Sequence, residues 1–547
     1  MSYSFLTPNR QDDLSLQEPE QRSVADSDGS FLIPFCSDPE LKLVSTIFTY
    51  SSQLTSSQSI KVTWSGSEDP TNPLNWSHAR KWSATLLVSC FTFISPVSST
   101  MVAPALGEIA HDFNITSDIE RYLVMSIFLL AYALGPFILA PLSEMYGRVV
   151  VLQSANMVYL IFNTVCGFAT SREQILAFRF LSGLGGSAPQ AIGGGVLSDC
   201  WRKNERGAAT AVYSVMPFHW PGHWADRYDT TLHCKRPRLI VHAAGGYLTQ
   251  YMSWRWIFWI VSMADAVVQI LAFLFLRETY APKILATKKK MLQRDTHNQL
   301  LYTEYDEPDR TFLQLLRKNL VRPFRMLFTQ PAIQAIALYR GYQYGLMYLV
   351  LASFPTVWEG KYGQSKGRAS LNYISLGIGF VIGLQFCGRL IDIVYERLAK
   401  HYGDNGRPEY RLPLMIPGGL IVPTGLFIYG WTAEYKTHWI APNIGAAVFA
   451  IGLIICFQCC QTYVIDAYTR YAASATGVTA FVRTMAGFSF PLFADSLYRS
   501  LGLGWGNSLL GFISLGMGIV APALLWFYGE WMRAKSPYCA GDETSRV

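Results

Sequence analysis

The residues of this chain that could do chemistry are charged side chains inside otherwise apolar stretches. Arg179 lies in one such stretch, and the second half of the chain holds six more ionisable residues in or near apolar stretches: Arg340, Arg389, Asp392, Asp466, Arg483 and Asp495. A charge inside a bilayer is costly unless it has a partner or a water-filled space, so such residues typically serve proton or substrate passage. The pattern favours transport over covalent catalysis.

The apolar stretches carry no Ser/His/Asp set, nucleotide-binding loop or metal-ligand cluster, so a membrane enzyme is the least favoured class. Cys456-x-x-Cys459-Cys460 has ligand-like spacing. It lies in mid-stretch among Ile, Leu and Phe, however, which is typical of packing thiols. We therefore expect no catalytic residues, no metal and no cofactor.

About a dozen apolar stretches, each ~20 residues long, must position these charges, and that length crosses a ~30 Å hydrocarbon core. Half of the residues are hydrophobic and only 15% are charged, which is unusual for a soluble protein of 547 residues. The predicted spans are 83–105, 122–142, 150–170, 174–198, 207–250 (interrupted), 254–276, 331–355, 371–395, 413–433, 439–463, 473–497 and 505–529.

The spans fall into two sets of six, as an internally repeated transporter would show. The polar first 80 residues hold no basic segment followed by an apolar run, so we expect no cleaved signal peptide there. The predicted division is a disordered cytosolic tail (1–80), an N-terminal six-helix bundle (81–277), a cytosolic connector (278–328), a C-terminal six-helix bundle (329–532) and a cytosolic tail (533–547).

Lys and Arg concentrate in alternate loops, which places both termini in the cytosol. The net charge of +7 then reflects topology and contact with anionic lipid, not nucleic-acid binding. The acidic loop 107–120 lies on the opposite side and holds the sequon Asn114-Ile115-Thr116, so we expect glycosylation at Asn114. A second sequon, Asn75-Trp76-Ser77, falls in the cytosolic tail and should stay unmodified.

A short loop between the second and third spans reads Ala140-Pro141-Leu142-Ser143-Glu144-Met145-Tyr146-Gly147-Arg148. A turn with a carboxylate, a Gly and an Arg can hold two helices by a charge-assisted pair that breaks when the halves rock apart. The loop resembles the motif of the major facilitator superfamily, although Ala140 stands where Gly is usual. The resemblance implies that Glu144, Gly147 and Arg148 act in gating; the alternative is a topological anchor only.

The fourth span contains Arg179-Phe180-Leu181-Ser182-Gly183-Leu184-Gly185-Gly186-Ser187-Ala188-Pro189. This string resembles the fungal drug:proton antiporters with twelve spans, in which an Arg matching Arg179 is implicated in proton coupling. Asn72-Pro73-Leu74-Asn75-Trp76, Ser253-Trp254-Arg255-Trp256 and Glu278-Thr279-Tyr280-Ala281-Pro282 resemble the same branch. The likeness extends from about residue 68 to 538.

Charged residues of the second half suggest gating and proton coupling. Arg389 and Asp392, at i and i+3, look like a degenerate repeat of the first-half loop motif, so we interpret them as gating residues. Asp466 and Arg483 could form a proton-linked ion pair, although solvation at a helix end explains Asp466 equally well.

A polar aromatic cluster in the seventh span could line a central cavity and contact substrate, or could serve helix packing. Its members are Tyr339, Arg340, Tyr342, Gln343 and Tyr344.

The fifth span departs from the family pattern, in which Gly-Pro-x-x-Gly-Pro precedes Gly-Gly-Tyr. Gly245-Gly246-Tyr247 is present, but residues 219–238 carry several charges and two prolines that would be costly in lipid. The string His219-Trp220-Pro221-Gly222-His223-Trp224-Ala225 can be encoded by codons that read Ile-Gly-Pro-Ala-Ile-Gly-Pro one base later. We hypothesise that 219–243 mixes a frameshifted exon with a retained intron; the alternative is a genuine insertion.

These observations predict an all-α membrane protein with the major facilitator fold, two six-helix bundles of twelve helices whose fifth span is disrupted. The expected function is proton-coupled efflux of a small organic compound, a drug or secondary metabolite. Nutrient uptake on the same fold and a transport-inactive product are the alternatives. The expected partners are the small molecule, protons and the lipid bilayer, with no nucleic acid, and the chain should be a monomer in the plasma membrane or the vacuolar membrane.

Overall fold

The computed structural model describes residues 61–202, 205, 209, 213, 252–306, 312–404, 406–468 and 471–539. This part of the chain is almost entirely helical. Its first group of helices, the N-half, consists of α2 (His78–Thr100), α3 (Leu106–Asp112), α4 (Asp118–Tyr146), α5 (Arg148–Cys166), α6 (Arg172–Gly186), α7 (Ala188–Cys200) and α10 (Arg255–Phe275).

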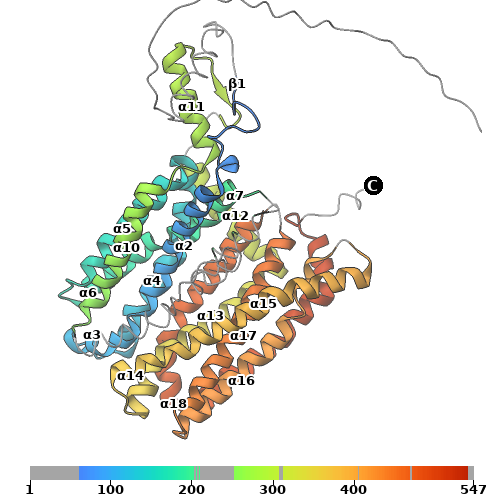
Figure 1. Ribbon diagram of the computed structural model, residues 1–547. Coiled ribbons are helices and arrows are strands. Elements are labelled where there is room, and N and C mark those ends of the chain that lie inside the picture. Colours follow the sequence, from blue (N-terminus) through green and yellow to red (C-terminus); the bar gives the residue numbers. More distant parts are fainter. Residues whose placement is uncertain are drawn as a thin grey trace, which may run out of the picture.

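The second group, the C-half, follows a connector and lies beside the N-half (Figure 1). It consists of α13 (Pro331–Pro355), α14 (Lys366–Leu371), α15 (Tyr373–Tyr402), α16 (Met415–Glu434), α17 (Ile440–Ala467) and α18 (Ala472–Ala534). A π-helix, η4 (Thr356–Lys361), follows α13, and a short 3-10 helix, η5 (Pro408–Arg411), precedes α16.

The described part of the connector holds α11 (Ala281–Thr296) and α12 (Phe312–Thr329). Figure 1 places α11 at one end of the molecule and both α3 and α14 at the opposite end. We call these the inner end and the outer end. By the predicted topology the inner end faces the cytosol.

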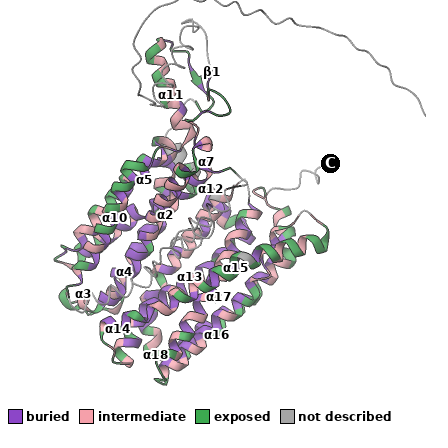
Figure 2. Ribbon diagram, in the orientation of Figure 1, coloured by how far each residue is buried: buried purple, intermediate pink, exposed green. Residues whose placement is uncertain are grey.

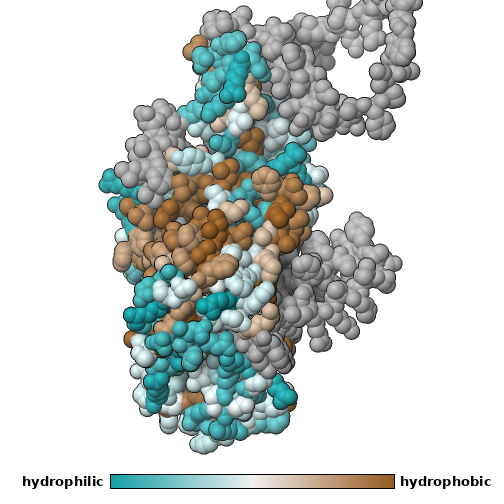
Figure 3. All heavy atoms as spheres, turned by 90° about the vertical axis from the view of Figure 1, so that its left-hand side faces the viewer, coloured by the Kyte–Doolittle hydropathy of each residue, from teal (hydrophilic) through white to brown (hydrophobic). Residues whose placement is uncertain are grey.

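Eight helical stretches of the described residues are long and apolar enough to cross a membrane. They are His78–Asp112, Asp118–Tyr146, Arg148–Cys166, Arg255–Phe275, Lys366–Tyr402, Pro408–Glu434, Ile440–Ala467 and Ser474–Ala534. Figure 3 shows a hydrophobic band on the N-half between hydrophilic ends. Helix α10 exposes large apolar side chains, among them Val267, Ile270 and Phe273. Contact with lipid requires such an apolar surface.

Buried residues line the faces that the helices turn toward one another, and exposed residues lie on the outside (Figure 2). Small residues allow several close helix contacts. A Cβ at Gly425 of α16 or Gly445 of α17 would collide with backbone atoms of the other helix. The predicted spans are thus packed as helices whose backbones approach closely.

Two predicted spans differ from the structure in continuity. The span 174–198 is broken at Ser187 into α6 and α7, because Pro189 lacks the N–H that a continuous helix would need. In the opposite sense, the spans 473–497 and 505–529 lie in one long element, α18. The left-handed φ of 71° at Gly502 interrupts it, so two helical segments remain.

The end of the expected disordered tail is ordered, so that expectation does not hold for residues 61–80. Strand β1 (Lys61–Val62) pairs in parallel with β2 (Tyr302–Thr303) of the connector, and a 3-10 helix, η1 (Pro73–Asn75), leads into α2. We call β1, η1, α11 and β2 the inner cap. The expected fifth span, 207–250, lies outside the described residues except for Ala209 and Tyr213.

Lysines of the connector fasten the inner cap. The ammonium group of Lys288 donates to the carbonyl of Thr63 at 3.2 Å and pairs with Asp69 at 3.5 Å. Lys289 pairs with Asp306 at 2.7 Å. Hydrogen bonds from Thr71 and Ser65, together with the charge of Lys288, lower the pKa of Asp69 although its burial acts in the opposite direction. Lys288 therefore binds the chain's own N-terminal segment, whereas Lys289 braces the connector internally.

Candidate functional site

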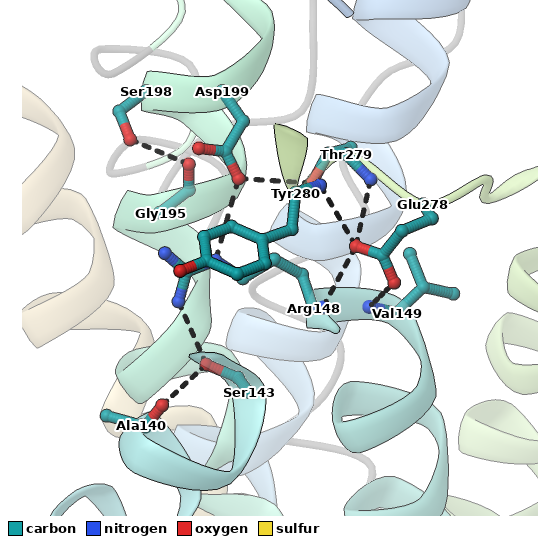
Figure 4. A network of polar contacts seen from close by, with 10 residues as sticks. All are labelled: Ala140, Ser143, Arg148, Val149, Gly195, Ser198, Asp199, Glu278, Thr279 and Tyr280. Carbon is teal, nitrogen blue, oxygen red and sulfur yellow. Dashed lines mark hydrogen bonds and ion pairs between the residues drawn. The ribbon is translucent and has the colours of Figure 1, made fainter. Parts of the chain in front are cut away.

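Arg148, at the first position of α5, is the centre of a polar network at the inner end of the N-half (Figure 4). Its Nη1 donates to the Ser143 hydroxyl at 2.9 Å, and its Nε lies 3.5 Å from a carboxylate oxygen of Asp199 at the end of α7. The guanidinium also lies 4.7 Å from the ring centre of Tyr280. The network therefore ties α4, α5, α7 and the segment after α10 together.

Glu278 caps the N-terminus of α5 within the same network. Its two carboxylate oxygens accept the backbone N–H groups of Arg148 at 2.9 Å and Val149 at 3.3 Å. The first N–H groups of a helix need outside acceptors, and a negative charge there interacts favourably with the helix dipole. Gly147 has φ of 104°, and a Cβ at this position would collide with the carboxylate of Glu278. The motif's glycine is thus required by both conformation and space.

The acid expected to pair with Arg148 was Glu144, and the structure corrects that expectation. Glu144 forms no ion pair or hydrogen bond with the residues that the structure describes, whereas Asp199 pairs with the Arg148 guanidinium and Glu278 accepts the backbone N–H of Arg148. Glu144 lies on the last turn of α4. Asp199 comes after the Arg179 string of the fourth span, and Glu278 opens the string that closes the sixth span. Their places in or near these family-like strings were the available signal.

The C-half carries a matching network around Arg411 of η5. Its Nη1 lies 2.6 Å from Asp392 of α15, and its Nε lies 3.0 Å from Asp466 at the end of α17. The two networks are alike. In the N-half, Arg148 begins α5 and pairs with Asp199 near the end of α7. In the C-half, Arg411 precedes α16 and pairs with Asp466 near the end of α17. Each network lies within its own half. Its ion pairs would therefore not have to break when the two halves separate.

The expected pair of Asp466 and Arg483 does not form. Asp466 is engaged by Arg411, and the Arg483 guanidinium instead lies 4.8 Å from the ring centre of Tyr344. Asp392 lies in the inner-end ion pair with Arg411, and its gating role stays a prediction. Arg389 is in α15, but its side chain lies outside the described residues.

Among the described residues, the ion pairs between the two halves gather at the outer end. Asp495 of α18 pairs with Arg121 of α4 and accepts a hydrogen bond from the Tyr122 hydroxyl at 2.7 Å. Arg499 lies 2.7 Å from Asp118, and Lys366 of α14 pairs with Glu108 of α3. We call these four contacts the outer lock. It closes the outer end in the conformation described here.

Sequence reasoning noted Asp495 and the acidic loop 107–120 but missed the rest of the outer lock. A signal was present: Lys366 and Arg499 are cations on the side where few are expected. Acids of the N-half and cations of the C-half at the same end could have been matched.

Arg179 of α6 is fully buried in the N-half. It donates to the carbonyls of Val124 and Ser98, both at 3.3 Å, and its guanidinium lies 4.7 Å from the ring centre of Phe128. Among the described residues it has no carboxylate partner. The buried charge is accommodated by carbonyl dipoles and an aromatic face.

A second buried ionisable group, Asp265 of α10, was missed by sequence reasoning. Its side chain is fully buried, and both oxygens accept from the Asn156 amide of α5, at 3.2 and 3.0 Å. The Asn156 amide also donates to Gln269 at 3.0 Å. Among the described residues no cation forms an ion pair with Asp265. An acid in the middle of the span 254–276 was the signal.

The structure divides the polar aromatic cluster of α13. Tyr339, Tyr342 and Gln343 bond inside the C-half, to Cys456 at 3.1 Å, the Leu510 carbonyl at 2.7 Å and Ser514 at 3.3 Å. These contacts favour the packing alternative for the three residues. Arg340 and Tyr344, one turn apart, lie on another face of α13. Tyr348, a turn further, shares a hydrogen bond of 2.9 Å with Ser99 of the N-half.

The structure also describes the predicted glycosylation site and the group of three cysteines. Asn114 is exposed in the turn after α3 at the outer end, with φ of 52°. Its position is compatible with glycosylation, which stays a prediction. Cys456, Cys459 and Cys460 are buried free thiols in the core of the C-half, and the described residues contain no group of acids, histidines and cysteines that could hold a metal.

Comparison with known proteins gives a consistent result. The family model described as Major Facilitator Superfamily matches residues 88–217 and 239–491. The chain is 44% identical to the efflux pump vrtL of Penicillium aethiopicum, over 88% of this chain and 92% of the relative. It is 41% identical to the MFS-type transporter penM of Penicillium rubens (87% and 90% covered) and 37% identical to the efflux pump radE of Floropilus chiversii (86% and 85% covered).

Solved structures show the same fold at low sequence identity. The partially occluded inward-open xylose transporter XylE of E. coli matches with a TM-score of 0.58 and 13% identity, over 82% of this chain and 98% of that chain. A bacterial homologue of the human lysosomal transporter Spinster, inward-facing and unoccupied, matches with a TM-score of 0.56 and 15% identity, over 84% and 100%.

Proposed function

The chain belongs to the Major Facilitator Superfamily, and we propose that it exports a small organic compound, such as a fungal secondary metabolite, in exchange for protons. The family consists of membrane transporters, not enzymes. Two relatives with at least 37% identity are called efflux pumps, which supports the outward direction. The structural observation that carries the proposal is the outer lock, because the ion pairs between the halves that the described residues form all lie at the outer end.

Alternating access follows from that asymmetry. With the outer lock formed, substrate can enter from the inner end; when it breaks, the halves rock and the outer end opens. Asp495 is the acid best placed to couple this step to protons, since it is 9% exposed and holds both Arg121 and Tyr122. A proton on Asp495 would remove the charge that attracts Arg121 and would favour the outward-open state.

The inner-end networks have a different role in this scheme. Arg148 with Asp199, and Arg411 with Asp392 and Asp466, hold the helices of one half together so that each half moves as a rigid body. Arg179 remains our proposed proton-coupling residue inside the N-half, where carbonyl groups stabilise its charge. We propose a monomer in the plasma membrane, divided into the bundles 81–277 and 329–532.

A second candidate function, a transport-inactive product, is favoured by one observation. The family model skips residues 218–238, and all but the first of them fall inside the anomalous stretch 219–243. A gap at that place supports the frameshift and retained-intron hypothesis over an ordinary helix. If cells make the chain as printed, the proposal is that its fifth span is disrupted and that flux is low or absent.

Reconstituted transport separates these possibilities. Proteoliposomes containing the printed chain, with a pH-sensitive dye inside, would receive aromatic test compounds such as fluorescein and rhodamine 6G under an imposed pH gradient. Compound-dependent proton movement is expected from an exporter. Compound flux that ignores the gradient would contradict proton coupling and favour the uptake alternative, and no flux for the printed chain alone would favour the inactive product.

A further inference from the structure

Two arginines of the C-half have N–H groups that remain without an acceptor among the described residues. Arg340 of α13 is only 6% exposed, and its Nε and Nη1 are buried and unpaired. The Nε of Arg483 on α18 is also buried and unpaired. Arginine keeps its charge at any physiological pH, and a buried cation without a partner is costly. These groups therefore point to a missing anion.

The packing of α13 against α18 brings the two arginines to one place. A Cβ on Gly341 would lie 3.3 Å from Val482, so the residues next to Arg340 and Arg483 touch. The two guanidinium groups are within electrostatic range of each other. Because like charges repel, a negative group bound between them would relieve the cost of keeping the two arginines together.

Aromatic rings complete this part of the C-half. Arg483 lies 4.8 Å from the ring centre of Tyr344, and Arg340 lies 5.8 Å from that of Phe457 on α17. The two rings are themselves 6.0 Å apart. We call Arg340, Arg483, Tyr344 and Phe457 the arginine–aromatic cluster.

The cluster lies where the C-half meets the N-half. Tyr344 packs against a hydrophobic cluster that contains buried residues of both halves, and its neighbour Tyr348 shares a hydrogen bond with Ser99 of the N-half. Arg483 and Tyr344 both lie within electrostatic range of the hydroxyl of Tyr132 on α4. A molecule held here would contact both halves, as a transported substrate must.

Acidic side chains of the C-half are engaged elsewhere. Each of five carboxylates forms an ion pair with another cation: Asp392 and Asp466 with Arg411, Glu409 with Arg533, Glu434 with Lys361, and Asp495 with Arg121. No described acid forms an ion pair with Arg340 or Arg483, so the described acids do not supply the counter-charge.

We propose that Arg340 and Arg483 bind the anionic oxygen of a small aromatic acid, a carboxylate or a phenolate, whose ring system stacks on Tyr344 and Phe457. Guanidinium groups match such oxygens with paired, charge-assisted hydrogen bonds, and the aromatic faces give apolar contact. The assignment rests on the proposed export function, since it names the substrate class of the same transporter. It also gives Arg483 a substrate-binding role in place of the expected ion pair with Asp466.

Two dyes with the same xanthene skeleton and opposite charge test this assignment. Fluorescein is an anion at pH 7.5 and rhodamine 6G is a cation. Binding to the full chain in nanodiscs of phosphatidylcholine, a lipid without net charge, would be measured by fluorescence anisotropy. Fluorescein should bind more tightly than rhodamine 6G. Tighter or equal binding of the cation by the unmodified chain would overturn the proposal without any variant.

Variants then locate the site. Arg340→Gln and Arg483→Gln should each weaken fluorescein binding about tenfold or more, since each removes charge-assisted hydrogen bonds, and should leave rhodamine 6G binding unchanged or tighter. Arg340→Lys keeps the positive charge and should weaken fluorescein binding less than Arg340→Gln does. Arg172→Gln, at an exposed outer-end position, is the matched control and should change neither dye. An equal loss for both dyes would overturn the proposal.

Stability and flux keep this test separate from its premise. Because the Arg340 guanidinium has no described acceptor, Arg340→Gln should not lower the melting temperature, which checks that the variant folds. The binding measurement needs no gradient. Arginine-dependent fluorescein binding without proton-coupled flux would uphold the anion site and contradict export. Proton-coupled flux of other compounds without fluorescein binding would uphold export and overturn the anion site.

Discussion

Arg121 of α4 and Asp495 of α18 form an ion pair that joins the two halves of the molecule at the outer end. The Tyr122 hydroxyl adds a hydrogen bond of 2.7 Å to the same carboxylate. Breaking the outer lock therefore requires the loss of a charged contact that is largely shielded from solvent. The predictions below begin with this pair.

Asp495→Asn should shift the conformational equilibrium toward an open outer end. The substitution keeps the shape but removes the charge, and a hydrogen bond to a charged group contributes ~1.5–3 kcal/mol, about 10–100-fold in population. Spin labels at Asn114 and Gly360, exposed positions of opposite halves, would report a longer distance by pulsed electron resonance. Asp404→Asn, at the inner end, is the control; an unchanged distance distribution in Asp495→Asn would contradict the role of the pair.

Glu278→Gln should destabilise the protein more than Glu144→Gln. Loss of the capping charge at the start of α5 is expected to cost about 1–2 kcal/mol, whereas Glu144 contacts no described partner. Thermal unfolding of the detergent-purified variants would show the difference. An equal or larger loss for Glu144→Gln would restore that residue as the acid of the loop motif.

Asn156→Leu should destabilise the N-half by about 1–3 kcal/mol, because it leaves the buried carboxylate of Asp265 without its amide donor. The double variant Asn156→Leu with Asp265→Leu should recover part of that loss, since removing both polar partners avoids the unpaired group. Unfolding of the two single variants and the double variant completes the cycle. If the loss of stability in the double variant equalled the sum of the losses in the two single variants, the two side chains would not interact.

Lys288→Ala should free the N-terminal segment of the inner cap, with little effect on the helical halves. The variant loses the hydrogen bond to Thr63 and the pair with Asp69. Limited proteolysis should cut before residue 78 faster than in the unmodified chain, and Lys290→Ala is the neighbouring control.

Acidification should weaken the ion pair between Lys288 and Asp69 in the unmodified chain. The pKa of Asp69 is lowered in the folded state, by hydrogen bonds from Thr71 and Ser65 and by Lys288 against the effect of burial. A lowered folded-state pKa means that the contribution to stability is complete above the unfolded value of about 3.8 and is lost as the pH falls below it. Cleavage that does not depend on Lys288 would contradict the cap.

Replacing His219–Ala225 by Ile-Gly-Pro-Ala-Ile-Gly-Pro and deleting 228–243 should raise proton-coupled flux relative to the printed chain. The change removes charges and prolines that lipid disfavours. Sequencing the transcript across 205–250 shows which form cells make. Greater flux from the printed chain than from the repaired one would favour a genuine insertion.

The sequence alone was sufficient for the family and for most of the helices. The family resemblance drawn from the Arg179 string and the loop before Arg148 is confirmed by the family match, and α13 begins and ends where the span 331–355 was predicted. Hydropathy and span length are local properties, so a run of side chains is enough to reveal them. Charge in alternate loops is local in the same sense.

Only the tertiary structure decided which charges meet. Arg121 and Asp495 are 374 positions apart, and the backbone N–H of Arg148 meets Glu278 across 130 positions. Such pairs depend on how each helix is rotated and packed against the next, which no single span encodes. For the same reason the sequence grouped five residues of α13 into one cluster, and helix geometry divided them between the packed interior and the face that meets the N-half.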